Sequence, residues 1–348
     1  MSAVLPVAAQ QRLGPRPRPR WMITLVVVTV LTVTLALVTL AWGSAGVKPA
    51  DLLDALSGEA DTRTAFVLER LRGPRLLTAV GAGIAFGLSG ALFQSVTRNP
   101  LGSPDVIGLG AGAGAGVAIA TLWFPGAVSA PVGALAGAAV AVSLVWWSTG
   151  SGFASPGRVI LTGIGVFAMA TAVTQYVVAV ALRDSAQGLA AYVVGSLNAR
   201  SMHHGLIIAL CLVALLPWAV LLSRRLRLMD LGDDAAQGLG VPAVPTRTWA
   251  IILAVLLAAA AVSVAGPVAF VALTAPHIAR RLVGASGPQL AASAAVGALL
   301  LVAADLAAQQ VPVLAGLPVG IVTTGLGGLY LGFLLLRLWR GGRPVALS

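Results

Sequence analysis

Long apolar stretches separated by short charged segments dominate this chain. A helix needs about 20 residues to cross the roughly 30 Å hydrocarbon core of a bilayer, so uncharged stretches of that length predict membrane-crossing helices. The sequence predicts ten crossings: Trp21–Val47, Leu76–Thr97, two within Val106–Gly157, Val159–Leu182, Ser201–Ser223, two within Thr248–Ala279, Leu282–Ala304 and Leu306–Leu336. The predicted fold class is therefore an all-α polytopic membrane protein.

Turn-forming residues divide the longest of these stretches. Trp123-Phe124-Pro125-Gly126 predicts a tight turn between the third and fourth crossings. Gly266-Pro267 divides a full crossing from a short one that ends near His277, because proline interrupts the helical hydrogen bonds. The segment from Pro312 to Pro318 predicts the last turn. Five crossings then fall in each half of the chain.

The amount and distribution of charge indicate a membrane protein and predict which side of the membrane each loop faces. Of the 348 residues, 58% are hydrophobic and only 9% charged, against roughly 25% charged in soluble domains. The net charge of +11 is spread over short clusters and forms no single stripe, which argues against nucleic-acid binding. Cytoplasmic loops carry the excess of basic residues, and this rule predicts that both termini are cytoplasmic. We expect an Arg/Pro-rich tail at 1–20, then one transmembrane domain at 21–348 whose inverted halves span about 21–200 and 201–338.

Several classes of protein are disfavoured by what the sequence lacks. One cysteine, Cys211, provides neither a disulfide framework nor a thiolate metal site. The single lysine, Lys48, is outside any phosphate-binding loop motif, so the chain does not bind ATP in that way by itself. His277 is on the opposite side of the predicted membrane from His203 and His204, so no three-histidine metal site is expected. Paired acids and a nucleophile with its base are also missing at membrane depth, so we predict no enzyme.

The loop after the sixth crossing contains a short polar segment. Gly232 precedes a predicted helix that Asp233 or Asp234 would cap, and Gly238 and Gly240 would end it. A two-turn polar helix between crossings suits a docking element, although an ordinary connector has the same composition. The two aspartates could also form a Mg²⁺ site, but the second acidic cluster that such a site needs is missing.

Several longer motifs resemble one known family. The chain is similar, from about Arg70 to Leu336, to the FecCD family, the permease subunits of binding-protein-dependent ABC importers for ferric siderophores, haem and cobalamin. The motifs that carry this resemblance are Arg72-Gly73-Pro74-Arg75-Leu76, Ser89-Gly90-Ala91-Leu92-Phe93-Gln94, Arg98-Asn99-Pro100-Leu101-Gly102-Ser103-Pro104-Asp105, Gly232-Asp233-Asp234-Ala235-Ala236, Ala265-Gly266-Pro267, Pro276-His277-Ile278-Ala279-Arg280 and Leu317-Pro318-Val319-Gly320. Gly195-Ser196-Leu197-Asn198 and the segment from Ala303 to Gln310 most resemble the second permease subunit of ferric enterobactin systems.

The resemblance implies partners and an assembly. Two permeases would combine with two ATPases, which bind ATP-Mg, and with a periplasmic or lipoprotein siderophore-binding protein in the bacterial inner membrane. This chain itself would hold no cofactor. The cargo would be a ferric catecholate or related siderophore, with haem or cobalamin as alternatives. The second permease would be a paralogue or another copy of this chain.

The resemblance also implies roles for particular residues. The ATPase-coupling helix would comprise Gly232, Asp233, Asp234, Ala235, Gln237, Leu239 and Gly240. The binding protein would dock near Arg72, Arg75 and Gln309. Arg72 could instead contact lipid phosphates at the interface. Where some relatives have a second external arginine, this chain has Gln309, which favours pairing with a different permease subunit.

Polar residues inside the predicted crossings are further candidates. Thr171, Thr174 and Gln175 share a helical face on the fifth crossing and would line the pathway, or form ordinary interhelical hydrogen bonds. Pro276, His277 and Asp305 are expected to be structural or gating residues, with an external arginine as the partner of Asp305. The rival function is an ion-coupled secondary transporter. Such a transporter needs titratable groups near the middle of the membrane, and Asp305 is the only candidate in the predicted crossings.

Overall fold

The computed structural model describes residues 20–42, 47–48, 51, 54–55, 57, 59, 61–150, 153, 156–181, 194–285 and 287–340. Within these ranges the chain is helical and has no strand. The main helices are α1 (Trp21–Ala41), α4 (Gly73–Thr97), α5 (Leu109–Trp123), α6 (Ala130–Ser148), α7 (Pro156–Ala181), α9 (Met202–Met229), α11 (Ala243–Ala265), α12 (Val271–Val283), α13 (Leu290–Gln310) and α14 (Val319–Arg340). Four short elements connect them: α3 (Thr62–Phe66), η1 (Val67–Arg72), η2 (Pro104–Ile107) and α10 (Asp233–Gly238).

Each predicted crossing corresponds to one of the main helices, five in each half of the chain. Among the described residues, 7 helices are long and apolar enough to cross a membrane, and α5 and the first part of α14 are shorter apolar helices. The 13 residues of α12 extend only about 20 Å, so this helix is too short for an upright crossing. The predicted tail at 1–20 lies outside the described residues except for Arg20, and the domain boundaries stay a prediction.

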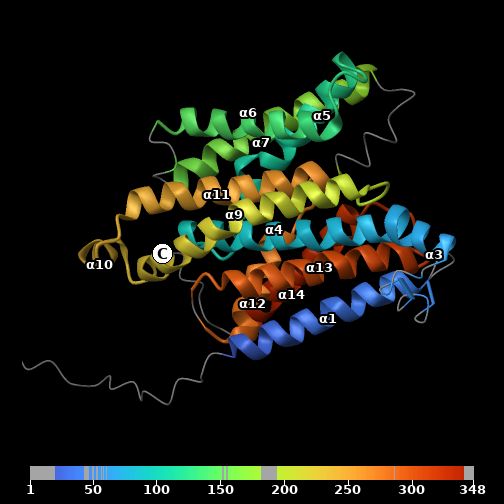
Figure 1. Ribbon diagram of the computed structural model, residues 1–348. Helices are drawn as coiled ribbons and strands as arrows, with labels where there is room; N and C mark the ends of the chain where they lie inside the picture. Colours follow the sequence, from blue (N-terminus) through green and yellow to red (C-terminus); the bar gives the residue numbers. More distant parts are fainter. Residues whose placement is uncertain are drawn as a thin grey trace, which may run out of the picture.

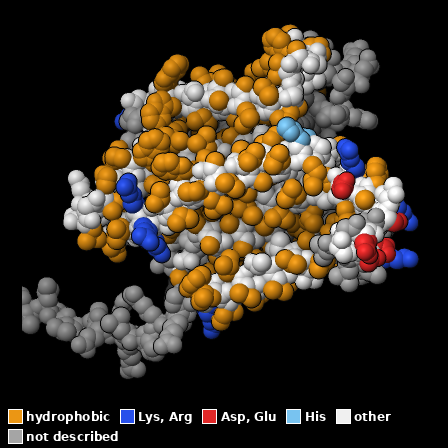
Figure 2. Space-filling model, viewed as in Figure 1, with side chains coloured by type: hydrophobic (Ala, Val, Ile, Leu, Met, Phe, Trp, Pro, Cys, Tyr) orange, Lys and Arg blue, Asp and Glu red, His pale blue; other side chains and the backbone are white. Residues whose placement is uncertain are grey.

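The helices form a bundle with α4 and α11 at its centre (Figure 1). Most of both helices is buried, and α4 packs against α13, α11, α9 and α12. On one side α1 covers α13, and on the other α5, α6 and α7 pack together. Hydrophobic side chains cover the middle of the visible face, whereas basic side chains lie toward both of its ends and acidic ones toward one end (Figure 2). The α3 and α10 elements lie at these opposite ends (Figure 1).

Glycines allow the closest helix packing. Helices in lipid associate through van der Waals contact, and small residues let their backbones approach. A Cβ added at Gly116 would lie 2.0 Å from the carbonyl oxygen of Gly133, and one at Gly137 would lie 2.1 Å from that of Gly112. The Gly112-x-x-x-Gly116 and Gly133-x-x-x-Gly137 motifs therefore pack against each other and join α5 to α6. By contrast, a Cβ at Gly328 would meet no atom within 4 Å.

Two connections, one before α12 and one before α5, interrupt the regular α-helical structure. One, between α11 and α12, begins at Gly266 with φ 74° and ends at Phe270 with φ 69°. The amide of Ser196 donates to the carbonyl of Ala265 at 2.8 Å, so the segment that precedes α9 pairs with the end of α11. The other connection runs from Arg98 (φ 49°) through η2 to Gly108 (φ 80°) at the start of α5. Both connections lead into the interior of the bundle.

Adding a methyl group at Gly116 should destabilise the protein. In Gly116→Ala the new Cβ meets fixed backbone atoms of α6, and overpacking of this kind costs about 1–3 kcal/mol. We expect the midpoint of thermal unfolding in detergent to fall by several degrees. Gly328→Ala is the matched control, since its Cβ enters open space. Equal midpoints for the two variants would contradict this account of α5–α6 packing.

Candidate functional site

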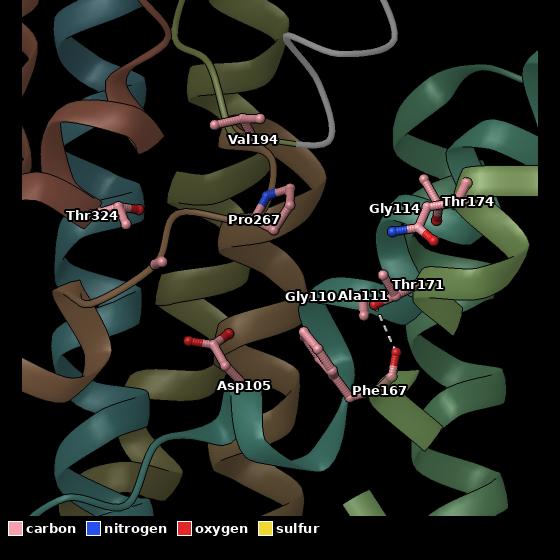
Figure 3. A pocket seen from close by; sticks show the side chains of 12 residues that line it. Asp105, Gly110, Ala111, Gly114, Phe167, Thr171, Thr174, Val194, Pro267 and Thr324 are labelled. Carbon is pink, nitrogen blue, oxygen red and sulfur yellow. Dashed lines mark hydrogen bonds between the residues drawn. The ribbon is translucent and has the colours of Figure 1, made fainter. Parts of the chain in front are cut away.

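A cavity of about 470 Å³ lies between the two halves of the chain (Figure 3). Helix α7 contributes Phe167, Thr171, Thr174 and Gln175 to its wall, so the three polar residues predicted for the pathway do lie together. In the remaining wall, Asp105 comes from η2, and Gly110, Ala111 and Gly114 come from α5. Val194 comes from the segment before α9, Pro267 and Ala269 from the unwound segment after α11, and Thr324 from α14. Both irregular connections therefore supply cavity-lining residues.

The hydroxyls of Thr171 and Thr174, two of the residues on the cavity wall, form hydrogen bonds within α7. The hydroxyl of Thr171 donates to the carbonyl of Phe167 at 2.8 Å, and that of Thr174 to the carbonyl of Ala170 at 3.0 Å. Both bonds stay within α7, which is the usual way that threonine satisfies its hydroxyl inside a helix. The interhelical hydrogen bonds considered as an alternative are therefore not made by these two hydroxyls.

Asp105 is a cavity residue that the sequence analysis did not assign. It is the one charged residue among those that line the cavity, and its carboxylate accepts a hydrogen bond from the Ser103 hydroxyl at 2.9 Å. In the sequence Asp105 is only the end of a family motif, because it lies between crossings and outside any helical pattern. Its place on the cavity wall depends on η2 turning the chain inward.

The predicted polar helix after the sixth crossing is α10. Its N-cap is Gly232, whose φ of 108° suits glycine, and no side chain caps it. The prediction that Asp233 or Asp234 caps the helix is therefore wrong. Ala236 is the buried residue of α10, whereas Asp234, Ala235 and Gln237 are exposed. Leu239, immediately after the helix, is 60% exposed, and Gly240 has φ 81°.

The Asp233 carboxylate does not cap because it binds two arginines. Its Oδ1 accepts from Arg98 Nη2 at 2.6 Å and its Oδ2 from Arg247 Nη2 at 2.8 Å. The hydrogen bond from Arg247 and the positive charges of both arginines hold the pKa of Asp233 below its ordinary value. Because the pKa is lowered, these ion pairs persist at neutral pH and weaken only as the pH falls through that lowered value.

The three predicted docking residues meet at the opposite end of the bundle. Arg72, Arg75 and Gln309 line one polar cavity of about 370 Å³ together with Asn198 and Gln310. The Arg72 guanidinium donates to the carbonyls of Thr39, Leu40 and Trp42, so it covers the C-terminal end of α1. In this conformation Arg72 holds α1 against α4, and its position is therefore fixed within the chain.

Arg75 and Asp305 form an ion pair on the wall of the same cavity. Arg75 Nη2 lies 2.7 Å from Asp305 Oδ1, and the two side chains are 20% and 3% exposed. Gln309 Nε2 donates to Asp305 Oδ2 at 2.7 Å. Asp305 thus has an arginine partner, and Arg75, expected only for docking, joins α4 to α13.

The Pro276 and His277 pair lies within α12. His277 Nδ1 is 2.6 Å from the hydroxyl of Tyr330 on α14. Three residues further on, Arg280 Nη2 donates to Gln94 Oε1 at 2.7 Å, and Gln94 Nε2 donates to the carbonyl of Leu273 at 2.9 Å. Side chains of α12 therefore connect it to α14 and α4. Whether Pro276 and His277 act in gating stays a prediction.

No group of three or more His, Cys, Asp and Glu side chains that could hold a metal ion occurs in the part of the chain described by the structure.

Comparison with known proteins identifies the family. The model of the FecCD transport family matches residues 29–337. The chain belongs to this family. It is 41% identical to the ferric enterobactin transport system permease protein FepG of Escherichia coli, over 91% of this chain and 97% of FepG. It is 34% identical to the achromobactin transport system permease protein CbrC of Dickeya dadantii, over 86% of this chain and 87% of CbrC.

A solved structure supports the same family. It is an inward-facing conformation of a metal-chelate type ABC transporter, and the match has a TM-score of 0.75 at 26% identity, over 91% of this chain and 99% of that one. The protein is thus a multi-span membrane permease of the FecCD family and not a member of an enzyme family. Family membership supports neither the ion-coupled secondary transporter nor the intramembrane enzyme that the sequence analysis weighed.

Removing one partner of the Arg75–Asp305 pair should cost more stability than removing both. Breaking a buried ion pair leaves an uncompensated charge at a cost of about 3–5 kcal/mol, whereas apolar replacement of both partners is often close to neutral. We expect Asp305→Ala to lower the thermal unfolding midpoint strongly, and Arg75→Met with Asp305→Leu to recover much of the loss. The exposed Asp234→Ala serves as control. An Asp305→Ala variant as stable as this control would refute a structural role for the pair.

Proposed function

We propose that this chain is the permease subunit of an ATP-driven importer that moves a ferric siderophore into the cytoplasm by alternating access. One observation carries the proposal: α10, an exposed two-turn helix, lies at the end of the bundle opposite α3 (Figure 1), and the polar cavity lined by Arg72 and Arg75 lies beside the elements that follow α3. A permease driven by a separate ATPase needs an intracellular contact for that ATPase and an external contact for the protein that delivers the cargo. The cavity lined by Thr171, Thr174 and Gln175 lies between them.

The orientation of the chain follows from its charges. Arg98, Arg247, Arg280 and Arg281 lie around the α10 end, and the positive-inside rule assigns that end to the cytoplasm. Ala235, Gln237 and Leu239 are then exposed to an ATPase that binds ATP-Mg, and both termini are cytoplasmic. The α3 end faces the periplasm or cell exterior, where acidic residues of a siderophore-binding protein dock beside Arg72, Arg75 and Gln309.

The pathway forms with a second permease subunit. Helix α7 presents Leu161, Met169 and Tyr176 with exposed fractions of 72%, 63% and 60%, close to the polar residues that face the cavity. A neighbouring subunit would cover this surface and close the cavity into a pathway. Gln309 in place of a second external arginine favours a paralogue as that neighbour.

The proposed cargo is a ferric catecholate or related siderophore. FepG is named for ferric enterobactin and CbrC for achromobactin, and both match nearly the full length of this chain. The siderophore would hold the iron throughout, so the metal would travel as part of the substrate and would need no ligands from this chain.

Transport by the reconstituted complex tests the proposal. Proteoliposomes that contain this chain, its partner permease, the ATPase and the binding protein should accumulate ⁵⁵Fe-enterobactin only with ATP. Dissipating the proton and sodium gradients with ionophores should leave uptake unchanged. Uptake that continues without ATP but collapses with an ionophore would exclude an ATP-driven importer.

The exposed leucine after α10 should contribute to ATPase binding. We expect Leu239→Asp to reduce co-purification of the ATPase at least tenfold, because a buried interfacial carboxylate without a partner is costly. Leu239→Met, which keeps an apolar side chain of similar volume, should bind as the unmodified chain does. Normal ATPase capture by Leu239→Asp would place the ATPase contact elsewhere.

A further inference from the structure

The first residue of α10, Asp233, is joined by side-chain contacts to the ends of two longer helices, and through one of these contacts to a third. Besides its ion pair with Asp233, Arg98 Nη2 donates to the carbonyl of Met229 at 3.0 Å. Arg98 is the C-cap residue of α4, Met229 is the last residue of α9, and Arg247 lies near the start of α11. The Asp233 carboxylate therefore connects α10 with α4 and α11, and Arg98 connects this junction with α9.

Apart from these contacts, α10 is held weakly. Ala236 is its buried residue, and Val241 follows as a buried apolar residue. Glycines with positive φ flank the helix, Gly232 at 108° and Gly240 at 81°, so the chain on both sides can change direction at little steric cost. The direction in which α10 points therefore depends to a large extent on the arginines that bind Asp233.

The two helices joined through Asp233 both lead to the central cavity. After Arg98 the chain continues into η2, which carries Asp105 onto the cavity wall. Helix α11 ends at Gly266, and the unwound segment that follows supplies Pro267 and Ala269 to the same wall. A displacement applied at Asp233 would therefore reach one irregular connection directly through Arg98 and the other along α11.

We propose that Arg98 and Arg247 are positioning residues that clamp α10 to α4 and α11 through Asp233, so that movement of α10 moves the walls of the central cavity. This inference rests on the proposed function, in which the ATPase pushes α10. The clamp differs from the ATPase contact itself, because the exposed residues of α10 would make that contact, whereas both arginines belong to neighbouring helices of this chain.

Because the ion pair of Arg98 with Asp233 is exposed, its effect on coupling can be distinguished from an effect on folding. The side chains of Arg98 and Asp233 are 52% and 40% exposed, whereas that of Arg247 is 12% exposed. An ion pair as exposed as that of Arg98 with Asp233 adds little to global stability. Loss of the Arg98 pair should therefore leave the protein folded and assembled while reducing the transmission of movement, which is a coupling free energy between two sites.

Neutral substitutions in the full transporter test the clamp. We expect Arg98→Gln with Arg247→Gln to assemble with the ATPase and to hydrolyse ATP, while ⁵⁵Fe-enterobactin taken up per ATP falls about tenfold. Arg98→Lys with Arg247→Lys should recover part of this loss, because lysine keeps the positive charge. Arg225→Gln is the matched control: it removes one exposed arginine of α9 that forms no ion pair with any described residue. Unchanged uptake per ATP in the double Gln variant would overturn the proposal.

A distance measurement tests the clamp independently of transport. Spin labels at Gln237 on α10 and Leu256 on α11, in a Cys211→Ala background, should give a narrow distance distribution that broadens in the double Gln variant and not in Arg225→Gln. An unaltered distribution in the double Gln variant would also overturn the clamp. If the unmodified complex failed to transport with ATP, the proposed function would fall, and the spin-label distances would still decide whether the arginines orient α10.

Discussion

The close approach of helix backbones in a medium without water is the constraint on which this structure depends. Lipid chains are as apolar as leucine, so burial of apolar surface drives helix association far less than it does in water, and contact between small residues takes its place. Gly116 and Gly137 bring α5 and α6 to backbone contact, and Gly83 and Gly297 do the same for α4 and α13. The buried centre of the bundle is assembled from such contacts.

The same packing permits irregular backbone inside the bundle. Non-helical backbone at membrane depth is tolerated where other protein segments supply its hydrogen bonds or where it lines a cavity. The Ser196 amide binds the Ala265 carbonyl, and the Gly320 amide binds that of Gly195. A close-packed surrounding holds the segment from Gly266 to Phe270 in its unwound form. The cavity wall can then change shape without breaking a continuous helix.

The ion pairs among the described residues lie at the two ends of the bundle, and each end uses them differently. The pair of Arg75 with Asp305 is largely shielded from solvent, so its main effect is to hold α4 against α13. At the other end the Asp233 carboxylate is partly exposed and shared by two arginines, so it joins a short helix to the ends of two longer ones. One end thus provides rigidity, and the other provides a contact that can transmit movement.

The sequence by itself determined the fold class, the family, the number and order of the ten main helices and the short polar helix at Asp233–Gly238, whereas the bounds of α12, α13 and α14 differ by several residues from those predicted. These follow from the length of apolar stretches, from turn residues and from motifs, all of which are local along the chain. Thr171, Thr174 and Gln175 could be grouped because residues three and four apart share a helical face.

Contacts between distant segments were decided only by the tertiary structure. Asp233 was expected to cap its own helix, but two arginines 135 and 14 residues away along the chain bind its carboxylate instead. An external arginine was expected as the partner of Asp305, but only the structure shows that it is Arg75, 230 residues away and expected for docking. Asp105 reached the cavity wall only because η2 turns the chain inward. Local patterns fix which residues form helices, whereas the partner of a charged side chain depends on which helices lie next to one another.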